Sequence, residues 1–246
     1  MSTENDYLKK TGKGTRSVHS GTSSGEKSLN TPVYQSSTFL LDDEAYEMWK
    51  AGTPRAPVYT RYNNPSMRAV EKKIAHLEGA EDALVFTSGM SAICTTLLTF
   101  LSQGDRIVTT RNLYGATVLS LDQDFTRFGI DVHYIDIKDL DAVEEALKEK
   151  KTNVLYCETV NNPLLEVSDL PELAKLAKKY GAIPIVDSTF ATPMGCQPLD
   201  YGFEVVIHSV TKLLNGHSDI IGGAVAGNKE IINQIWYKLR NFGGTM

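Results

Sequence analysis

The sequence has 246 residues, enough to bury the core of one large α/β domain. A hydrophobic content of 41% beside 22% charged residues is typical of a globular chain and excludes a disordered one. The net charge of −5 argues against nucleic acid or an anionic membrane as the main partner. The most apolar helical stretch, at 92–101, is too short to span a bilayer.

Three cysteines, Cys94, Cys157 and Cys196, stand in or beside apolar segments and lack the spacing of metal ligands. An odd number of buried thiols predicts reduced cysteines, a cytoplasmic protein and no metal site. The opening residues, "MSTENDYLKKTGKGTRS", contain no apolar stretch of the kind that begins a signal peptide. This agrees with the expected cytoplasmic location.

The first 64 residues give weak structural signals. Residues 1–28 are polar and rich in glycine and serine, which predicts a mobile arm or one draped over a neighbouring chain. Residues 42–64 are rich in tyrosine, and we expect them to be irregular. We therefore interpret 1–64 as an N-terminal arm that contacts a partner, and 65–246 as an α/β domain.

From residue 65, helical and strand-like segments alternate. Helices are expected at 66–79, 139–151 and 168–181, with Asp139 and Ser168 as N-caps and glycines at both 79 and 181 as stops. The expected strands are 83–88, 106–110, 132–136, 153–158, 183–189, 204–209 and 222–227. The alternation predicts a mostly parallel seven-stranded sheet flanked by helices.

Ligands of such sheets bind beyond the carboxyl ends of the strands. The sequence places a Ser-Gly-Met turn with Gly89 there, at the start of a helix whose free N–H groups could face a phosphate. Tyr114 and Asn162 follow two further strands, and Asp187 ends another. Each has an ordinary interpretation as well: a rim aromatic, a turn residue and a helix cap.

Lys212 follows the strand 204–209, between Ser209, Thr211 and a Gly-His-Ser-Asp segment. A single lysine at a strand end is most often a surface residue that extends into water. Its neighbours at the same sheet edge favour pyridoxal phosphate chemistry instead. That cofactor needs a lysine for its aldehyde, a carboxylate such as Asp187 for its ring nitrogen, and an aromatic plate such as Tyr114.

The sequence resembles the Cys/Met-metabolism (trans-sulfuration) enzymes, a family that includes cystathionine γ-lyase, cystathionine γ-synthase, methionine γ-lyase and O-acetylhomoserine sulfhydrylase. The motifs that carry the resemblance are "TPVYQSSTF" (31–39), "YTRYNNPS" (59–66), "FTSGM" (86–90), "LYGAT" (113–117), "ETVNNPLL" (158–165), "VDSTFATP" (186–193), "HSVTKLLNGHSDIIGG" (208–223) and "RNFGGTM" (240–246). The resemblance implies the large domain of the aspartate-aminotransferase-like fold (fold type I) and pyridoxal 5′-phosphate as cofactor.

The resemblance also assigns roles. Lys212 would form the Schiff base and shuttle protons, Asp187 would pair with the ring nitrogen, and Tyr114 would stack on the ring and protonate the leaving group. The phosphate would be held by Gly89, Met90, Ser209 and Thr211, and the phenolic oxygen by Asn162. Tyr59 and Arg61 would reach the phosphate of a neighbouring subunit. The implied assembly is a homodimer that completes both sites, within a homotetramer.

The activity implied is γ-elimination from a sulfur amino acid, as in cystathionine γ-lyase, with the γ-replacing synthase or sulfhydrylase and methionine γ-lyase as alternatives. Two departures bear on this choice. The family's C-terminal domain, which supplies the arginine for the substrate carboxylate, would lie beyond Met246, and Ala116 stands where methionine γ-lyases carry a cysteine. An inactive fragment, an aminotransferase and a β-lyase stay open as rivals.

Overall fold

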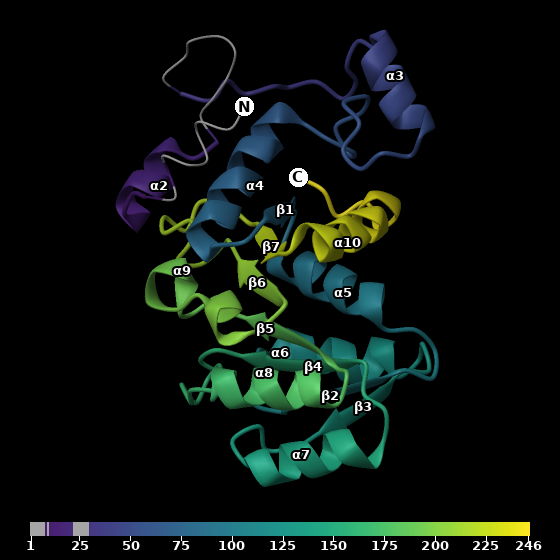
Figure 1. The fold of residues 1–246 in the computed structure, drawn as a ribbon, viewed down its shortest axis with the longest axis vertical. Coiled ribbons are helices and arrows are strands. Elements are labelled where there is room, and N and C mark those ends of the chain that lie inside the picture. Colours follow the sequence, from purple (N-terminus) through teal and green to yellow (C-terminus); the bar gives the residue numbers. More distant parts are fainter. Residues whose placement is uncertain (1–7, 9, 22–29) are drawn as a thin grey trace.

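The computed structural model of the chain describes residue 8, residues 10–21 and residues 30–246. In this part of the chain, seven strands form one sheet in the order β1-β7-β6-β5-β4-β2-β3 (Figure 1). They are β1 (Asp82–Phe86), β2 (Arg106–Thr109), β3 (Asp131–Tyr134), β4 (Val154–Glu158), β5 (Ile183–Asp187), β6 (Val205–Ser209) and β7 (Gly223–Gly227). Every pair between β6 and β3 is parallel, and only β7 runs antiparallel to its neighbours. The predicted fold class is confirmed.

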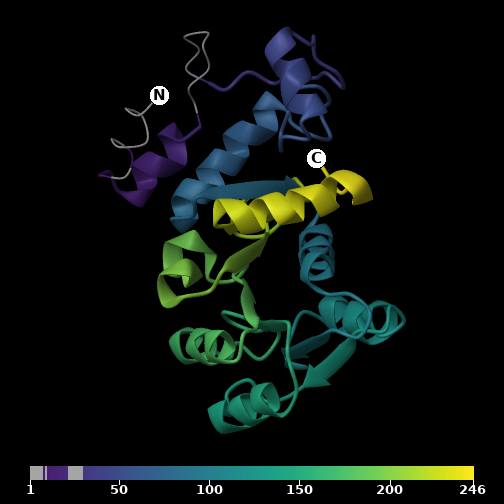
Figure 2. The same ribbon diagram turned by 45° about the vertical axis from the view of Figure 1, so that its right-hand side comes forward.

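Helices cover both faces of the sheet. The helices that flank it are α4 (Pro65–Glu78), α5 (Gly89–Phe100), α6 (Gly115–Ser120), α7 (Leu140–Glu149), α8 (Leu170–Lys179) and α10 (Lys229–Phe242). Short helical segments are α9 (Thr192–Gly195), η1 (Leu121–Phe125) and η2 (Pro198–Tyr201). Helices α5, α6 and α10 pack on one face, and α4, α7 and α8 on the other, as the two views in Figures 1 and 2 show.

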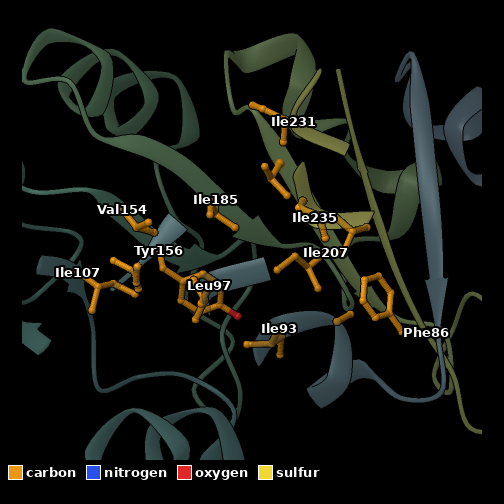
Figure 3. Packing of buried hydrophobic residues seen from close by; sticks show 14 of the residues in the cluster. Phe86, Ile93, Leu97, Ile107, Val154, Tyr156, Ile185, Ile207, Ile231 and Ile235 are labelled. Atoms are coloured by element: carbon orange, nitrogen blue, oxygen red, sulfur yellow. The ribbon is translucent and has the colours of Figure 1, made fainter. Parts of the chain in front are cut away.

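The strands are apolar because both of their faces are covered. Every residue of β4 is buried, and so is every residue of β6 except the last, Ser209. This burial explains why the two strands are largely continuous apolar runs in the sequence. On one face, Tyr156 and Ile185 of the strands pack against Leu97 of α5 in the cluster that Figure 3 shows. Burial of each aliphatic side chain in this cluster stabilises the fold by about 1.5–3 kcal/mol. The result is a rigid sheet whose carboxyl edge can hold side chains in fixed positions.

Most predicted helix ends are confirmed, with one correction. Asp139 caps α7 by accepting the amide of Ala142 at 3.0 Å, and Gly79 ends α4 with φ +70°. Ser168 was expected to cap α8, but Asp169 does so, since its carboxylate accepts the Glu172 amide. The Ser168 hydroxyl is engaged elsewhere, because it donates to a buried backbone carbonyl at the end of β4.

The expectation that residues 42–64 are irregular is wrong in part. Helix α3 (Asp43–Lys50) forms within this segment. Asp42 caps it by accepting the Ala45 amide at 2.8 Å, and two acidic residues in its first turn suit the helix dipole. The tyrosine content of the segment hid this cap signal.

The described part of the predicted arm also contains a helix, α2 (Lys13–His19), which lies against α4. Lys73 of α4 donates to the carbonyls of Ser17 and Val18. Helix α2 is thus held on its own chain rather than mobile, and contact of this arm with a partner stays a prediction. The rest of that prediction, for residues 1–7, 9 and 22–29, lies outside the described residues.

A buried ion cluster fixes residues just before α4 to the outer edge of the sheet. Arg55 pairs with Asp82 and Glu71, and it also donates to the carbonyl of Ala83. Glu71 accepts the amide of Val85. Both backbone groups belong to β1, an edge strand, so the cluster satisfies polar groups that a neighbouring strand would otherwise bind.

In the described residues, no helix combines the length and apolarity needed to cross a membrane.

Candidate active site

A cavity of about 960 Å³ opens at the carboxyl edge of the sheet, beyond β4, β5 and β6. Eight of the ten predicted site residues line it: Gly89, Met90, Tyr114, Asn162, Asp187, Ser209, Thr211 and Lys212. They come from five separate segments of the chain, and the parallel sheet brings these segments to one edge. The remaining two, Tyr59 and Arg61, do not line this cavity.

The amino end of α5 forms one wall of the cavity. Ser88 caps the helix by accepting the amide of Ser91 at 3.0 Å. The amides of Gly89 and Met90 bind no acceptor among the described residues, as expected for the first turn of a helix. A Cβ on Gly89 would stand 2.8 Å from that of Ser209, so only glycine lets the helix approach β6 this closely. Two free N–H groups therefore face the cavity beside a serine.

The two hydroxyls beside this helix end differ. The Ser209 hydroxyl makes no hydrogen bond with the described residues, whereas its backbone amide donates to the Thr189 hydroxyl at 2.8 Å. The Thr211 hydroxyl donates to the carbonyl of Gly222 and accepts its amide. Ser209 is thus free to bind an anion, while Thr211 would first have to release Gly222.

Asp187 is the last residue of β5 and only 7% exposed, yet it lines the cavity. Its carboxylate accepts the Thr189 amide at 2.8 Å. Burial raises the pKa of Asp187, while the hydrogen bonds from Thr189 and the nearby His208 oppose this rise. A cationic partner in the cavity would relieve the cost of burying this charge.

Lys212 lies in the exposed loop that follows β6, and its side chain lines the same cavity. Its ammonium makes no hydrogen bond or ion pair with the part of the chain that the structure describes. The loop is held by the backbone, since the Lys212 amide donates to the Ser209 carbonyl and its carbonyl accepts the Gly216 amide at 2.9 Å. The lysine amine is therefore free for a reaction partner in the cavity.

Glu158 is a cavity residue that the sequence analysis missed. It ends β4, is 6% exposed, and accepts the backbone amides of Tyr114 at 2.7 Å and Asn162 at 3.1 Å. Burial and the neighbouring charge of Asp187 raise the pKa of Glu158 to about 7. The available signal was its position: like Asp187, it closes a predicted strand at the ligand-binding edge.

Tyr59 and Arg61 lie on a different part of the chain, near the end of α10. Arg61 donates to the backbone carbonyl of Arg240, and its guanidinium stacks on the rings of Tyr59 and Tyr62. Tyr59 is 39% exposed. Neither residue is in a position to contribute to the cavity of its own chain in this arrangement.

The sequence matches the family model "Cys/Met metabolism PLP-dependent enzyme" over residues 14–246. The chain belongs to this family. Two curated relatives that the chain resembles carry lyase names. The chain is 44% identical over 234 residues to the L-methionine gamma-lyase of Fusobacterium nucleatum subsp. polymorphum, which covers 92% of this chain and 58% of the relative. It is 38% identical over 237 residues to the cystathionine gamma-lyase of Bacillus subtilis, and this match covers 95% of this chain and 60% of that relative.

Solved structures of family members share the fold. The crystal structure of metB from Corynebacterium glutamicum matches with a TM-score of 0.89 and 34% identity, over 97% of this chain and 61% of that one. The chain spans about three fifths of the length of the curated relatives that it matches. The predicted family and fold type are thus confirmed, and pyridoxal phosphate is the family's cofactor.

The residues of the cavity fit pyridoxal phosphate. The free amides of Gly89 and Met90 beside the Ser209 hydroxyl suit a phosphate group. A buried aspartate without a cationic partner suits a protonated pyridine nitrogen, and a free lysine suits an aldehyde. Across the described residues, no group of His, Cys, Asp or Glu side chains is arranged to hold a metal ion.

Proposed function

We propose that the protein is a pyridoxal phosphate-dependent C–S lyase that acts on a sulfur amino acid by γ-elimination. The observation that carries this proposal is the joint placement of Lys212, Asp187 and Tyr114 at one cavity with the α5 amino end. In the net reaction, the substrate and water give a thiol, a 2-oxo acid and ammonia. The first choice of substrate is cystathionine.

When bound, pyridoxal phosphate supplies an electron sink that stabilises negative charge on the substrate carbons next to the amino group. The chain's own residues supply the proton transfers. The Lys212 amine would accept the protons lost from Cα and then from Cβ, and the loss at Cβ allows the γ-substituent to leave. Asp187 would keep the pyridine nitrogen protonated through a charge-assisted hydrogen bond. The hydroxyl of Tyr114, a residue that is 46% exposed and lines the cavity, would donate the proton that the leaving sulfur needs.

Methionine γ-lyase is the second candidate, favoured by the name of the relative from Fusobacterium nucleatum. Ala116 weighs against it, because the resemblance places a cysteine of methionine γ-lyases at this position. Ala116 does not line the cavity. Replacement of the leaving group by an added thiol, as in the synthase and the sulfhydrylase, uses the same groups and stays a further alternative.

We also propose that Tyr59 and Arg61 complete the site of a second copy of the chain. Three observations support this proposal: both residues lie away from their own cavity, Tyr59 is exposed, and Arg61 uses one of its five N–H donors on the Arg240 carbonyl. The preceding segment is rich in exposed apolar side chains, with Leu40 fully exposed and Val33 77% exposed. A two-fold dimer would bury such a surface and make the exchange reciprocal.

The reaction can be tested by product stoichiometry. The full-length protein is incubated separately with L-cystathionine and L-methionine, and thiol, 2-oxo acid and ammonia are measured. Equal amounts of cysteine, 2-oxobutanoate and ammonia from cystathionine would support γ-elimination, with the Lys212→Ala variant as the inactive control. Pyruvate with homocysteine would indicate β-elimination, and an oxo acid without ammonia would indicate an aminotransferase. Either outcome would reject the proposed reaction.

A further inference from the structure

We propose that Glu158 is a positioning residue that holds Tyr114 and Asn162 at the cofactor through their backbone amides. The inference rests on the proposed function. Each oxygen of one carboxylate accepts one amide: Oε1 that of Tyr114 at 2.7 Å, and Oε2 that of Asn162 at 3.1 Å. The two amides belong to loops that follow β2 and β4, so one side chain ties together two otherwise separate loops.

The environment of Glu158 makes this tie strong. The residue is 6% exposed, and its carboxylate makes no ion pair within the described residues, so its two backbone amides are its main compensation for burial. At pH values above its pKa of about 7 the carboxylate is ionised, and hydrogen bonds to a charged acceptor are about twice as strong as neutral ones. The Glu158 carbonyl also accepts the Ser168 hydroxyl at 2.7 Å, which ties together the two ends of the loop that carries Asn162.

Glu158 places two groups with different tasks. Tyr114 is the residue before α6, so its amide fixes where the backbone turns and hence where the ring lies over the cavity. Asn162 lines the cavity from the opposite loop. Neither side chain is otherwise held, because neither the Tyr114 hydroxyl nor the Asn162 amide group has a partner in the described part of the chain. Their positions therefore depend on the backbone, and the backbone depends on Glu158.

A second carboxylate on the same loop provides a matched control. Glu166 pairs with Lys138 and accepts the side-chain amides of Asn112 and Asn161. It thus ties neighbouring loops too, but it does not line the cavity and does not bind the amides of Tyr114 or Asn162. A loss that only reflects loosened loops should appear in a Glu166→Gln variant as well.

The test uses Glu158→Gln and Glu158→Asp in the full-length protein, with Glu166→Gln as control. Gln keeps the size but turns one acceptor into a donor that faces an N–H group, and Asp keeps the charge but is one methylene shorter. Three quantities are measured: hydrogen exchange of the Tyr114 and Asn162 amides without cofactor, the visible circular dichroism of bound pyridoxal phosphate, and kcat and KM.

We expect amide exchange to speed up by about tenfold or more at the position that faces the new NH2 group in the Gln variant, which is the loss of one hydrogen bond to a charged group, and by less at the position that keeps an acceptor. The dichroism should change, because the ring and its aromatic neighbour no longer hold a fixed geometry. The value of kcat should fall more than KM rises, and Asp should recover part of each effect. The Glu166→Gln control should retain wild-type dichroism.

Unchanged exchange and dichroism in a folded Glu158→Gln variant would overturn the inference and leave the proposed function intact, provided that the wild type binds cofactor and releases thiol. If the wild type does neither, the proposed function fails, while the exchange data still test the contacts.

If both variants fail to fold, the amide proton shifts of Tyr114 and Asn162 in the cofactor-free wild type test the inference instead. Both should titrate with one common pKa, and unrelated or absent titrations would reject the shared carboxylate.

Discussion

Glu158 and Asp187 are register partners at the carboxyl ends of β4 and β5, so two buried carboxylates stand side by side in the floor of the cavity. Their hydrogen bonds differ in kind. Glu158 binds the amides of two distant loops, whereas Asp187 binds the amide of Thr189 two residues along the chain. Glu158 therefore positions the two loops, whereas Asp187 remains able to pair with a cation in the cavity.

Replacement of Asp187 by Asn should separate the two roles proposed for it. Asn retains an acceptor for the Thr189 amide but cannot hold a proton on the ring nitrogen. We expect pyridoxal phosphate to remain bound, while turnover falls by roughly 10²–10⁴-fold. Cofactor content by absorbance and steady-state rates check this, with the exposed Asp200→Asn variant as control. Near-wild-type turnover would show that Asp187 only caps its turn.

Replacement of Gly89 by Ala tests the wall formed by α5. The added Cβ would lie 2.8 Å from the Cβ and 3.1 Å from the Cα of Ser209, so helix and strand must move apart. We expect a stability loss of about 1–3 kcal/mol and weaker binding of pyridoxal phosphate. Gly115 is the matched control, because it also begins a helix and nothing lies within 4 Å of an added Cβ. Equal cofactor affinity in both variants would argue against a phosphate site at α5.

The raised pKa of Glu158 predicts a pH dependence of folding. Its pKa rises from an ordinary value of 4.5 to about 7 on folding, so the folded protein binds the proton more tightly than the unfolded chain. Its contribution is therefore fully present below pH 4.5 and lost as the pH rises through about 7. Without cofactor, the free energy of unfolding of the wild type should fall by up to about 3 kcal/mol, relative to that of Glu158→Gln, as the pH rises from 4.5 to 8.

Urea unfolding of both proteins at each pH measures this difference. Glu166 supplies a control, because its contribution to stability should change with pH in the opposite direction. Lys138 lowers the pKa of Glu166, so its contribution is present above its ordinary pKa and is lost as the pH falls. A pH-independent difference between the wild type and Glu158→Gln would mean that Glu158 titrates normally.

The exchange of Tyr59 and Arg61 between subunits predicts complementation. An Arg61→Ala chain and a Lys212→Ala chain should each be inactive, but hybrid dimers should regain activity, since one of their two sites has both residues. As control, mixing Lys212→Ala with Asp187→Ala should restore nothing, because both residues belong to the cavity of one chain. With subunit exchange verified by mass, absence of recovery in the first mixture would place Arg61 outside the partner's site.

The sequence was sufficient for the sheet and for most of the cavity, for a physical reason. Strands buried on both faces must be continuous apolar runs, and a parallel sheet brings their carboxyl ends together, so Asp187 and Lys212 could be placed from chain order alone. Contacts between distant segments could not be derived in this way. Glu158 lies 44 residues from Tyr114, and nothing local distinguishes its carboxylate from one that ends any strand.

The helix starts illustrate the same limit. Ser168 and Asp169 are both good caps, and the choice depends on the Glu158 carbonyl, which takes the Ser168 hydroxyl. For α3 the signal was local, with Asp42 ahead of two acidic residues, but the aromatic content of the segment outweighed it in the sequence analysis. Competition for a hydrogen-bonding group is therefore what sequence patterns express least well.

Lys212 is the lysine that we propose bonds the cofactor. The most direct measurement is borohydride reduction of the full-length protein with bound pyridoxal phosphate, followed by peptide mass mapping. We expect a yellow protein that loses its visible absorbance on reduction and carries the reduced cofactor on the peptide containing Lys212, with no label in a Lys212→Arg control. Label on another lysine, or no bound chromophore after incubation with pyridoxal phosphate, would contradict it.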